Sequence, residues 1–133
     1  MTLKLSHTVI TLKKSFREKG FLMKISELKE KLGLDLVTKN DYEDRDVEGC
    51  FVGDLLSWVM SHAESGNVWI TIMNNINVTA VASLCDVSCV ILAEGVTLPE
   101  DITKKADSVG IVVFKSEKSA YELAGMIYSE ENL

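Results

Sequence analysis

The 133-residue sequence has one proline, two histidines and no long apolar run. No stretch of it approaches the roughly 20 apolar residues that a helix needs to cross a bilayer. Near the N-terminus, Lys13 and Lys14 interrupt the short apolar pieces before a secretory signal core develops. We therefore expect a cytoplasmic protein that has no membrane partner.

Positive charge is also scarce. Fourteen Lys and Arg against 20 Asp and Glu give a formal net charge of -6. Because a nucleic-acid-binding protein needs a basic surface to neutralise phosphates, we expect no nucleic-acid partner. The hydrophobic share of 47% and the single proline exclude a long disordered chain. A chain of this length can bury one compact core.

Signatures of catalysis and of metal binding are missing as well. The sequence has no HExxH pair, no serine-histidine-aspartate elbow and no Walker lysine after a glycine-rich loop. Cys85 and Cys89 lie four residues apart without a histidine nearby, so we interpret them and Cys50 as reduced thiols in the core. We expect no catalytic residues, no metal and no cofactor.

From residue 50 onward the sequence alternates apolar strands with amphipathic helices. The segments VWITIM, CVILAEG and IVVFKS predict strands, and VEGCFV supplies an earlier one. The segment DLLSWVMSHAESG predicts the first of these helices, and its apolar face consists of Leu55, Leu56, Val59, Met60 and Ala63. Strands that are apolar on both faces and separated by helices form a parallel sheet that is covered on both sides. The sequence therefore predicts a small three-layer α/β domain with a mostly parallel sheet of about four strands.

The first third of the chain does not show this alternation of apolar strands and amphipathic helices. KISELKEKL predicts a short helix with Ser26 as its N-cap, followed by a short strand over residues 34–38. The β-branched run in residues 1–22 weakens a helical interpretation. We predict that residues 1–22 are an N-terminal extension and that residues 23–133 form a single domain.

The segment GCFVGDLLSWVM places two glycines and an aspartate directly before a helix. A phosphate-binding P-loop needs Lys and Ser or Thr after its glycines, whereas Gly53 is followed by Asp54. A carboxylate at this position would repel a phosphate, so we predict that Asp54 caps the helix instead. Trp58 and His62 follow Asp54 at four-residue steps, on the side away from the apolar face. Packing within the chain and contact with another subunit are both open interpretations of Trp58.

Polar residues follow two neighbouring predicted strands, where parallel α/β sheets bind their ligands. The candidate ligand-binding residues are Asn74, Asn75, Asn77 and Thr79 after one strand and Glu94, Gly95 and Thr97 after the next. Asparagine amides both donate and accept hydrogen bonds without adding charge, which suits a nucleobase, a ribose or a phosphate. A structural alternative is that Asn77 simply caps the following helix. Glu94 and Glu100 disfavour a polyanionic ligand.

The order of VEGCFVGDLLSWVM, VWITIMNNINVTAVASLCDVSCVILAEG and IVVFKSEKSAYELAG resembles the DRTGG domain, a small α/β module found beside CBS domains in some regulated pyrophosphatases. The family's Thr-Gly-Gly turn corresponds to Ala93-Glu94-Gly95, and asparagines stand where the family has Asp-Arg. The resemblance implies a regulatory or assembly module that is often dimeric. It also implies a fold related to the N-terminal domain of HPr kinase, without the kinase half.

We therefore expect a non-catalytic regulatory or ligand-sensing domain that forms a homodimer and binds a small metabolite or a nucleotide at the carboxyl ends of its strands. The expected interface residues are Trp58, His62, Tyr121 and Tyr128. Two alternatives remain open. A protein-docking adaptor would use Trp58 and the last helix, and a flavodoxin-like enzyme or phosphoacceptor domain would need acidic residues gathered at strand ends, which are dispersed in this sequence.

Overall fold

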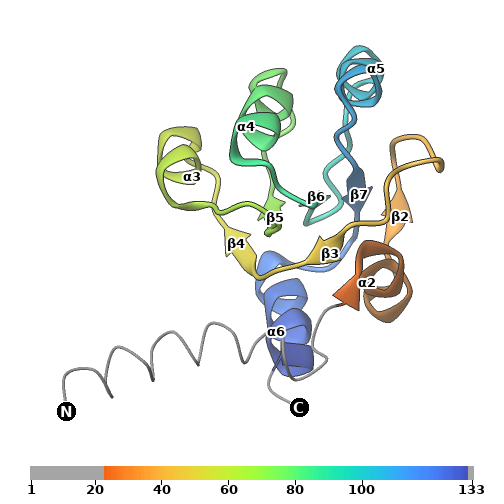
Figure 1. Cartoon of the computed structure of the whole chain (residues 1–133), viewed down its shortest axis with the longest axis vertical. Helices are drawn as coiled ribbons and strands as arrows, with labels where there is room; N and C mark the ends of the chain where they lie inside the picture. The colour runs from red at the N-terminus through yellow and green to blue at the C-terminus, as the bar shows by residue number, and fades with distance from the viewer. Residues whose placement is uncertain (1–22, 132–133) are drawn as a thin grey trace.

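The computed structural model describes residues 23–131, which contain a five-stranded sheet of order β2-β7-β6-β5-β4 between two layers of helices (Figure 1). The parallel strands are β4 (Cys50–Val52), β5 (Val68–Thr71), β6 (Cys89–Leu92) and β7 (Val113–Lys115). At one edge, β2 (Asp35–Leu36) pairs antiparallel with β7. The predicted three-layer, mostly parallel α/β fold is confirmed. The short strand predicted over residues 34–38 is β2, which joins the sheet as a fifth strand beside the four expected.

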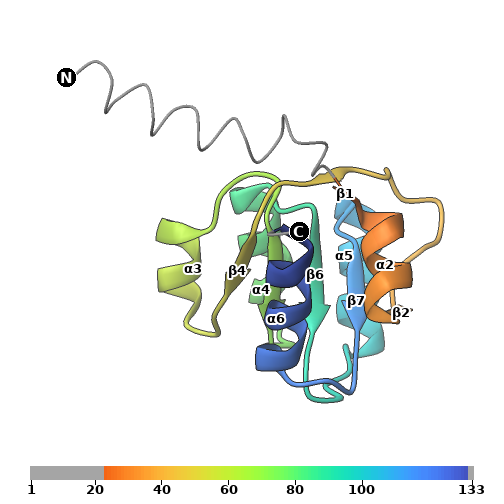
Figure 2. The same ribbon diagram turned by 90° about the horizontal axis from the view of Figure 1, so that it is seen from below.

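The helices divide between the two faces of the sheet (Figures 1 and 2). On one face lie α2 (Ile25–Leu32) and α6 (Ala120–Glu131). The other face carries α3 (Leu56–His62), α4 (Asn77–Cys85) and α5 (Glu100–Val109). A separate antiparallel pair joins β1 (Met23–Lys24) to β3 (Asp46–Val47), and β3 leads directly into β4. None of the helices in residues 23–131 is long and apolar enough to span a bilayer.

The strand side chains alternate between the two helical layers. Ile70, Ile91 and Phe114 pack toward α2 and α6, whereas Trp69 and Val90 pack toward α3 and α4. Every residue of β5 and β6 is buried. Each large apolar side chain buried in this way contributes about 1.5–3 kcal/mol, so the two central strands anchor both layers.

Two local predictions for the helices were wrong. Helix α2 begins at Ile25, one residue before the predicted cap, and the amide and hydroxyl of Ser26 donate to the Asp44 carboxylate at 2.9 and 2.6 Å. Pairing of β1 with β3 holds the chain extended up to that point. In α3, Val59 is buried as predicted, but Leu55 and Met60 are exposed. The reason is that α3 is only seven residues long and lies beside the edge strand β4.

The end of α4 opposite the candidate ligand loops is held by a polar cluster. Arg45 donates to the Asp86 carboxylate at 3.0 Å and to the carbonyl of Val87 at 3.0 Å, and the Ser65 hydroxyl donates to the same carboxylate. The hydrogen bond from Ser65 and the charge and hydrogen bond of Arg45 lower the pKa of Asp86. Asp86 adopts a left-handed conformation with φ 56° and ends the helix. These contacts link the β2–β3 connection to the centre of the fold.

The three cysteines are free thiols, as predicted. Cys89 is fully buried, and this burial raises the pKa of its thiol. Within residues 23–131 no three His, Cys, Asp or Glu side chains are grouped so as to hold a metal ion.

Candidate functional site

The two candidate ligand loops lie together at the carboxyl edge of the sheet. The strands β5 and β6 are parallel neighbours, so the loops that follow them emerge side by side. The Asn74 side chain joins these loops, because its Nδ2 donates to the carbonyl of Thr97 at 2.9 Å. A residue after β5 is therefore tied directly to a residue after β6.

A carboxylate from the preceding loop braces the end of β5. Asp54 Oδ1 accepts hydrogen bonds from the Thr71 hydroxyl at 2.8 Å and from the Ile72 amide at 2.9 Å. The predicted capping role of Asp54 was wrong, since α3 begins at Leu56 with Leu55 at the N-cap and no side-chain capping bond. The reason is the parallel β4–β5 register, which pairs Val52 with Ile70 and so brings the residue after β4 beside the end of β5.

The asparagines after β5 differ in their surroundings. Asn75 Oδ1 accepts the amide hydrogen of Asn77 at 3.0 Å. Asn77 is the first residue of α4, with Ile76 at the N-cap, so the alternative that Asn77 caps this helix was wrong. The side chains of Asn74 and Asn77 are exposed, and that of Asn75 is half-buried. Thr79 is only 3% exposed, and its hydroxyl donates to the carbonyl of Ile76 at 2.7 Å. The exposed polar atoms of this loop therefore belong to the asparagines.

The turn after β6 is fixed by the loop after β7. The amide of Glu94 donates to the carbonyl of Lys118 at 2.9 Å, and the amide of Gly95 donates to the carbonyl of Ser116 at 2.9 Å. Glu94 and Gly95 both have positive φ, at 60° and 73°. A Cβ on Gly95 would lie 2.5 Å from Glu117 Oε2, so the turn leaves no room for a side chain without movement of Glu117. From the sequence, only the loops after β5 and β6 were predicted to contribute. The segment KSEKS at the end of β7 lies at the same edge of the parallel sheet, so this third loop was also predictable.

Acidic side chains outnumber basic ones around these loops. Glu94 and Thr97 are exposed beside Glu117, while the Lys118 ammonium group turns away and donates to the carbonyl of Leu32 at 3.3 Å. The loops thus present neutral amide groups on one side and carboxylates on the other. Such a surface attracts a ligand that has hydrogen-bonding edges and little negative charge.

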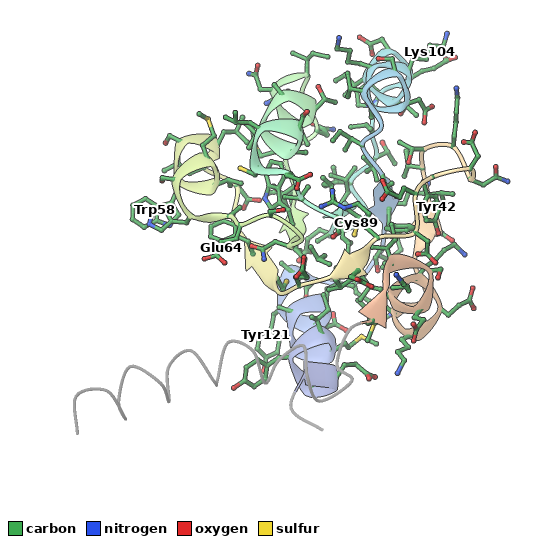
Figure 3. All side chains as sticks on the ribbon, in the orientation of Figure 1. Tyr42, Trp58, Glu64, Cys89, Lys104 and Tyr121 are labelled. Atoms are coloured by element: carbon green, nitrogen blue, oxygen red, sulfur yellow. The ribbon has the colours of Figure 1, made fainter. Side chains whose placement is uncertain are left out.

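The predicted interface residues lie on a different surface. Trp58 is 57% exposed, and its ring stacks on that of His62 with centroids 4.0 Å apart. His62, Tyr121 and Tyr128 line a groove of about 700 Å³ between β4 and α6. Figure 3 shows Trp58, Glu64 and Tyr121 on the same side of the molecule. None of the seven candidate ligand residues lines this groove, so the candidate ligand loops and the aromatic groove are separate surfaces.

Comparison with known families connects this fold to a described domain. A family model described as the DRTGG domain matches residues 27–129. The chain belongs to the DRTGG domain family. The match spans nearly all of the described sheet and helices, and it confirms the resemblance seen in the order of the sequence segments. In this DRTGG domain the Ala93-Glu94-Gly95 turn is the one tied to the loop after β7.

A solved structure shares the fold. It contains the CBS and DRTGG domains of the regulatory region of Clostridium perfringens pyrophosphatase, complexed with the activator diadenosine tetraphosphate. The similarity has a TM-score of 0.61 at 16% sequence identity and covers 77% of this chain and 45% of that chain. The present DRTGG domain therefore corresponds to less than half of that regulatory region. A search of curated proteins gave no match.

Proposed function

We propose that this DRTGG domain is a non-catalytic regulatory module that senses a small molecule at the carboxyl edge of its sheet. The hydrogen bond from Asn74 to the carbonyl of Thr97 carries this proposal, because it holds two strand-end loops together as one surface. The proposed contact residues are Asn74, Asn75 and Asn77 on one loop and Glu94, Gly95 and Thr97 on the other. Thr79 has an indirect role, because its hydroxyl donates to the carbonyl of Ile76 and so helps to hold the asparagine loop in place.

The negative charges on these loops limit the chemical class of ligand that the surface can bind. Asparagine amides can pair with the edge of a nucleobase or with ribose hydroxyls. Glu94 and Glu117 oppose a chain of phosphates at the same place. A nucleoside or a nucleotide of low charge fits this surface best. The pyrophosphatase region with the same fold was crystallised with a dinucleoside polyphosphate, which supports a nucleotide-type ligand, although its four phosphates are the part that this edge resists.

A thermal unfolding series tests the proposal. The full chain is heated alone and with adenosine, AMP, ATP and diadenosine tetraphosphate. A ligand at one hundred times its dissociation constant adds about 2.7 kcal/mol to the free energy of unfolding, which should raise Tm by roughly 10 °C in a domain of this size. We expect adenosine or AMP to give a larger rise than either polyphosphate.

A matched pair of variants locates the binding. Asn74→Ala removes the loop-joining amide and should abolish the ligand-induced rise in Tm. Asn40→Ala, which changes an exposed asparagine in the β2–β3 connection, should leave the rise intact. Identical Tm values with every ligand, or an equal rise in both variants, would contradict the strand-end site.

We further infer that the module forms a homodimer through Trp58, His62, Tyr121 and Tyr128. Tryptophan and tyrosine are, with arginine, the residues most enriched among the hot spots of protein interfaces, and Tyr121 is 88% exposed. Sedimentation velocity of the full chain should show a dimer that Trp58→Ala weakens. A species near 14.7 kDa at high concentration would remove this part of the proposal. The same exposed tyrosines favour a protein-docking adaptor as the second candidate function.

A further inference from the structure

The groove between β4 and α6 is an apolar surface of unusual composition for a free domain. Val52, Tyr121 and Tyr128 line it, and all three side chains are exposed. Domains rarely leave several large apolar side chains gathered on one surface unless something binds there. The strand β4 is also the edge of the sheet, which makes its outer side a template for an additional extended segment.

The charge of this groove is negative. Glu48 and Glu64 are among its lining residues, and none of the described lining residues is Lys or Arg. Residues 1–22 have the opposite charge. They hold five of the chain's 14 Lys and Arg and one of its 20 Asp and Glu, a net charge of +4. Residues 23–133 therefore carry -10, against -6 for the whole chain.

The basic segment is attached to the domain at Met23, close to the acidic groove. Residue 22 precedes Met23, which pairs antiparallel with Val47. Because the pairing is antiparallel, Met23 lies at the end of this pair from which β3 continues toward Glu48 and β4. The segment therefore joins the domain beside one of the acidic residues that line the groove.

Residues 1–22 also have the length and the apolar content to cover the groove. Even in a compact helical form, 22 residues would span about 33 Å, comparable to the diameter of a small domain. Their large apolar residues are Leu3, Leu5, Val9, Ile10, Leu12, Phe16, Phe21 and Leu22. A short tether makes binding intramolecular, at an effective concentration near the millimolar range.

We propose that residues 1–22 occupy the groove between β4 and α6 of their own chain. The apolar side chains of the segment cover Tyr121 and Tyr128, and its basic side chains face Glu48 and Glu64. The consequence for assembly rests on the proposed function: the segment competes with the second copy for Tyr121 and Tyr128, so its release promotes self-association.

Hydrogen exchange of the full chain tests this placement. Lys13→Glu with Lys14→Glu reverses the charge of the segment, and amides in residues 49–53 and 120–130 should then exchange about tenfold faster. Lys104→Glu with Lys105→Glu is the matched control, because it makes the same charge change at an adjacent lysine pair on α5, on the opposite face of the sheet from α6. The control should leave those amides unchanged.

A charge swap separates this contact from a loss of folding. Adding Glu48→Lys and Glu64→Lys to the segment variant should restore slow exchange. Unchanged exchange in the Lys13/Lys14 variant, equal acceleration in the control, or no recovery in the swap overturns the placement. Protection that grows with protein concentration would assign the groove to a partner's segment and also overturn it.

Sedimentation of the same samples distinguishes the two proposals. The Lys13/Lys14 variant should form more dimer than the unaltered chain at equal concentration. If both remain monomeric, the proposed self-association fails, while the exchange data still decide where residues 1–22 bind.

Discussion

Replacing Thr71 by Val removes one hydroxyl from a buried position at the end of β5. Thr71 is 1% exposed, and its hydroxyl donates to the Asp54 carboxylate at 2.8 Å and accepts from the Met73 amide at 3.1 Å. A hydrogen bond to a charged group contributes about 1.5–3 kcal/mol. Because Asp54 is exposed and can recover water, we expect a loss near the lower limit, about 1.5–2 kcal/mol.

A second buried threonine provides the control. Thr79 is 3% exposed, and its hydroxyl donates to the neutral carbonyl of Ile76. Thr79→Val should cost only about 0.5–1.5 kcal/mol, the range for a neutral hydrogen bond. The two substitutions are chemically identical, so the difference between them reports the charge of Asp54 together with the bond that the Thr71 hydroxyl accepts from the Met73 amide.

Urea unfolding followed by circular dichroism measures both costs under two-state analysis. A double-mutant cycle that combines Thr71→Val with Asp54→Ala should give a coupling of about 1 kcal/mol or more. The reasoning is refuted if Thr71→Val costs no more than Thr79→Val, or if the coupling is below about 0.3 kcal/mol. Either result would mean that the Asp54 carboxylate does not brace the strand-end loops.

Three further predictions, made with four substitutions, test the described geometry. Burial raises the pKa of the Cys89 thiol. The free energy of unfolding should therefore fall as pH rises above the ordinary thiol pKa near 8.5, by up to about 1.4 kcal/mol per pH unit. In urea titrations at alkaline pH, Cys89→Ala should reduce this dependence on pH. The hydrogen bonds from Ser65 and Arg45 lower the pKa of Asp86, so its contribution is present above about pH 4 and is lost as pH falls through the lowered value; Asp86→Asn, which tolerates the left-handed conformation, should remove that acid-dependent part. Gly95→Ala should lower the free energy of unfolding by about 1 kcal/mol because φ is 73°. At Gly125, within α6, an added Cβ would meet no atom of residues 23–131 within 4 Å, so Gly125→Ala should raise the free energy of unfolding by about 0.5–1 kcal/mol. Calorimetry should show Tm shifts of opposite sign.

The sequence predicted the parallel part of the fold well because its signals are local. Each position of β5 and β6 is apolar or β-branched, and their full burial follows from helices on both faces. The pairing of β2 with β7 had no such signal. A two-residue strand shows no periodicity, and its partner lies about 80 positions further along the chain.

The candidate site was predictable only to the level of adjacency. Parallel strands required the loops after β5 and β6 to meet, and the bond from Asn74 to Thr97 confirms that they do. The partner of Asp54 could not be predicted, because capping a helix and accepting from Thr71 use the same carboxylate and only the β4–β5 register decides between them. The groove could not be predicted either, because it is formed by β4 and α6, which lie some 70 residues apart in the chain.

The antiparallel edge strand also bears on the order in which the chain folds. Pairing of Asp35 with Lys115 closes a loop of about 80 residues, and long-range closures of this kind slow folding. During synthesis β2 leaves the ribosome long before β7 exists, so it waits without its partner. The units from β4 to β7 need only short crossovers and can assemble first. The earliest strand of the main sheet is therefore expected to be the last to join it.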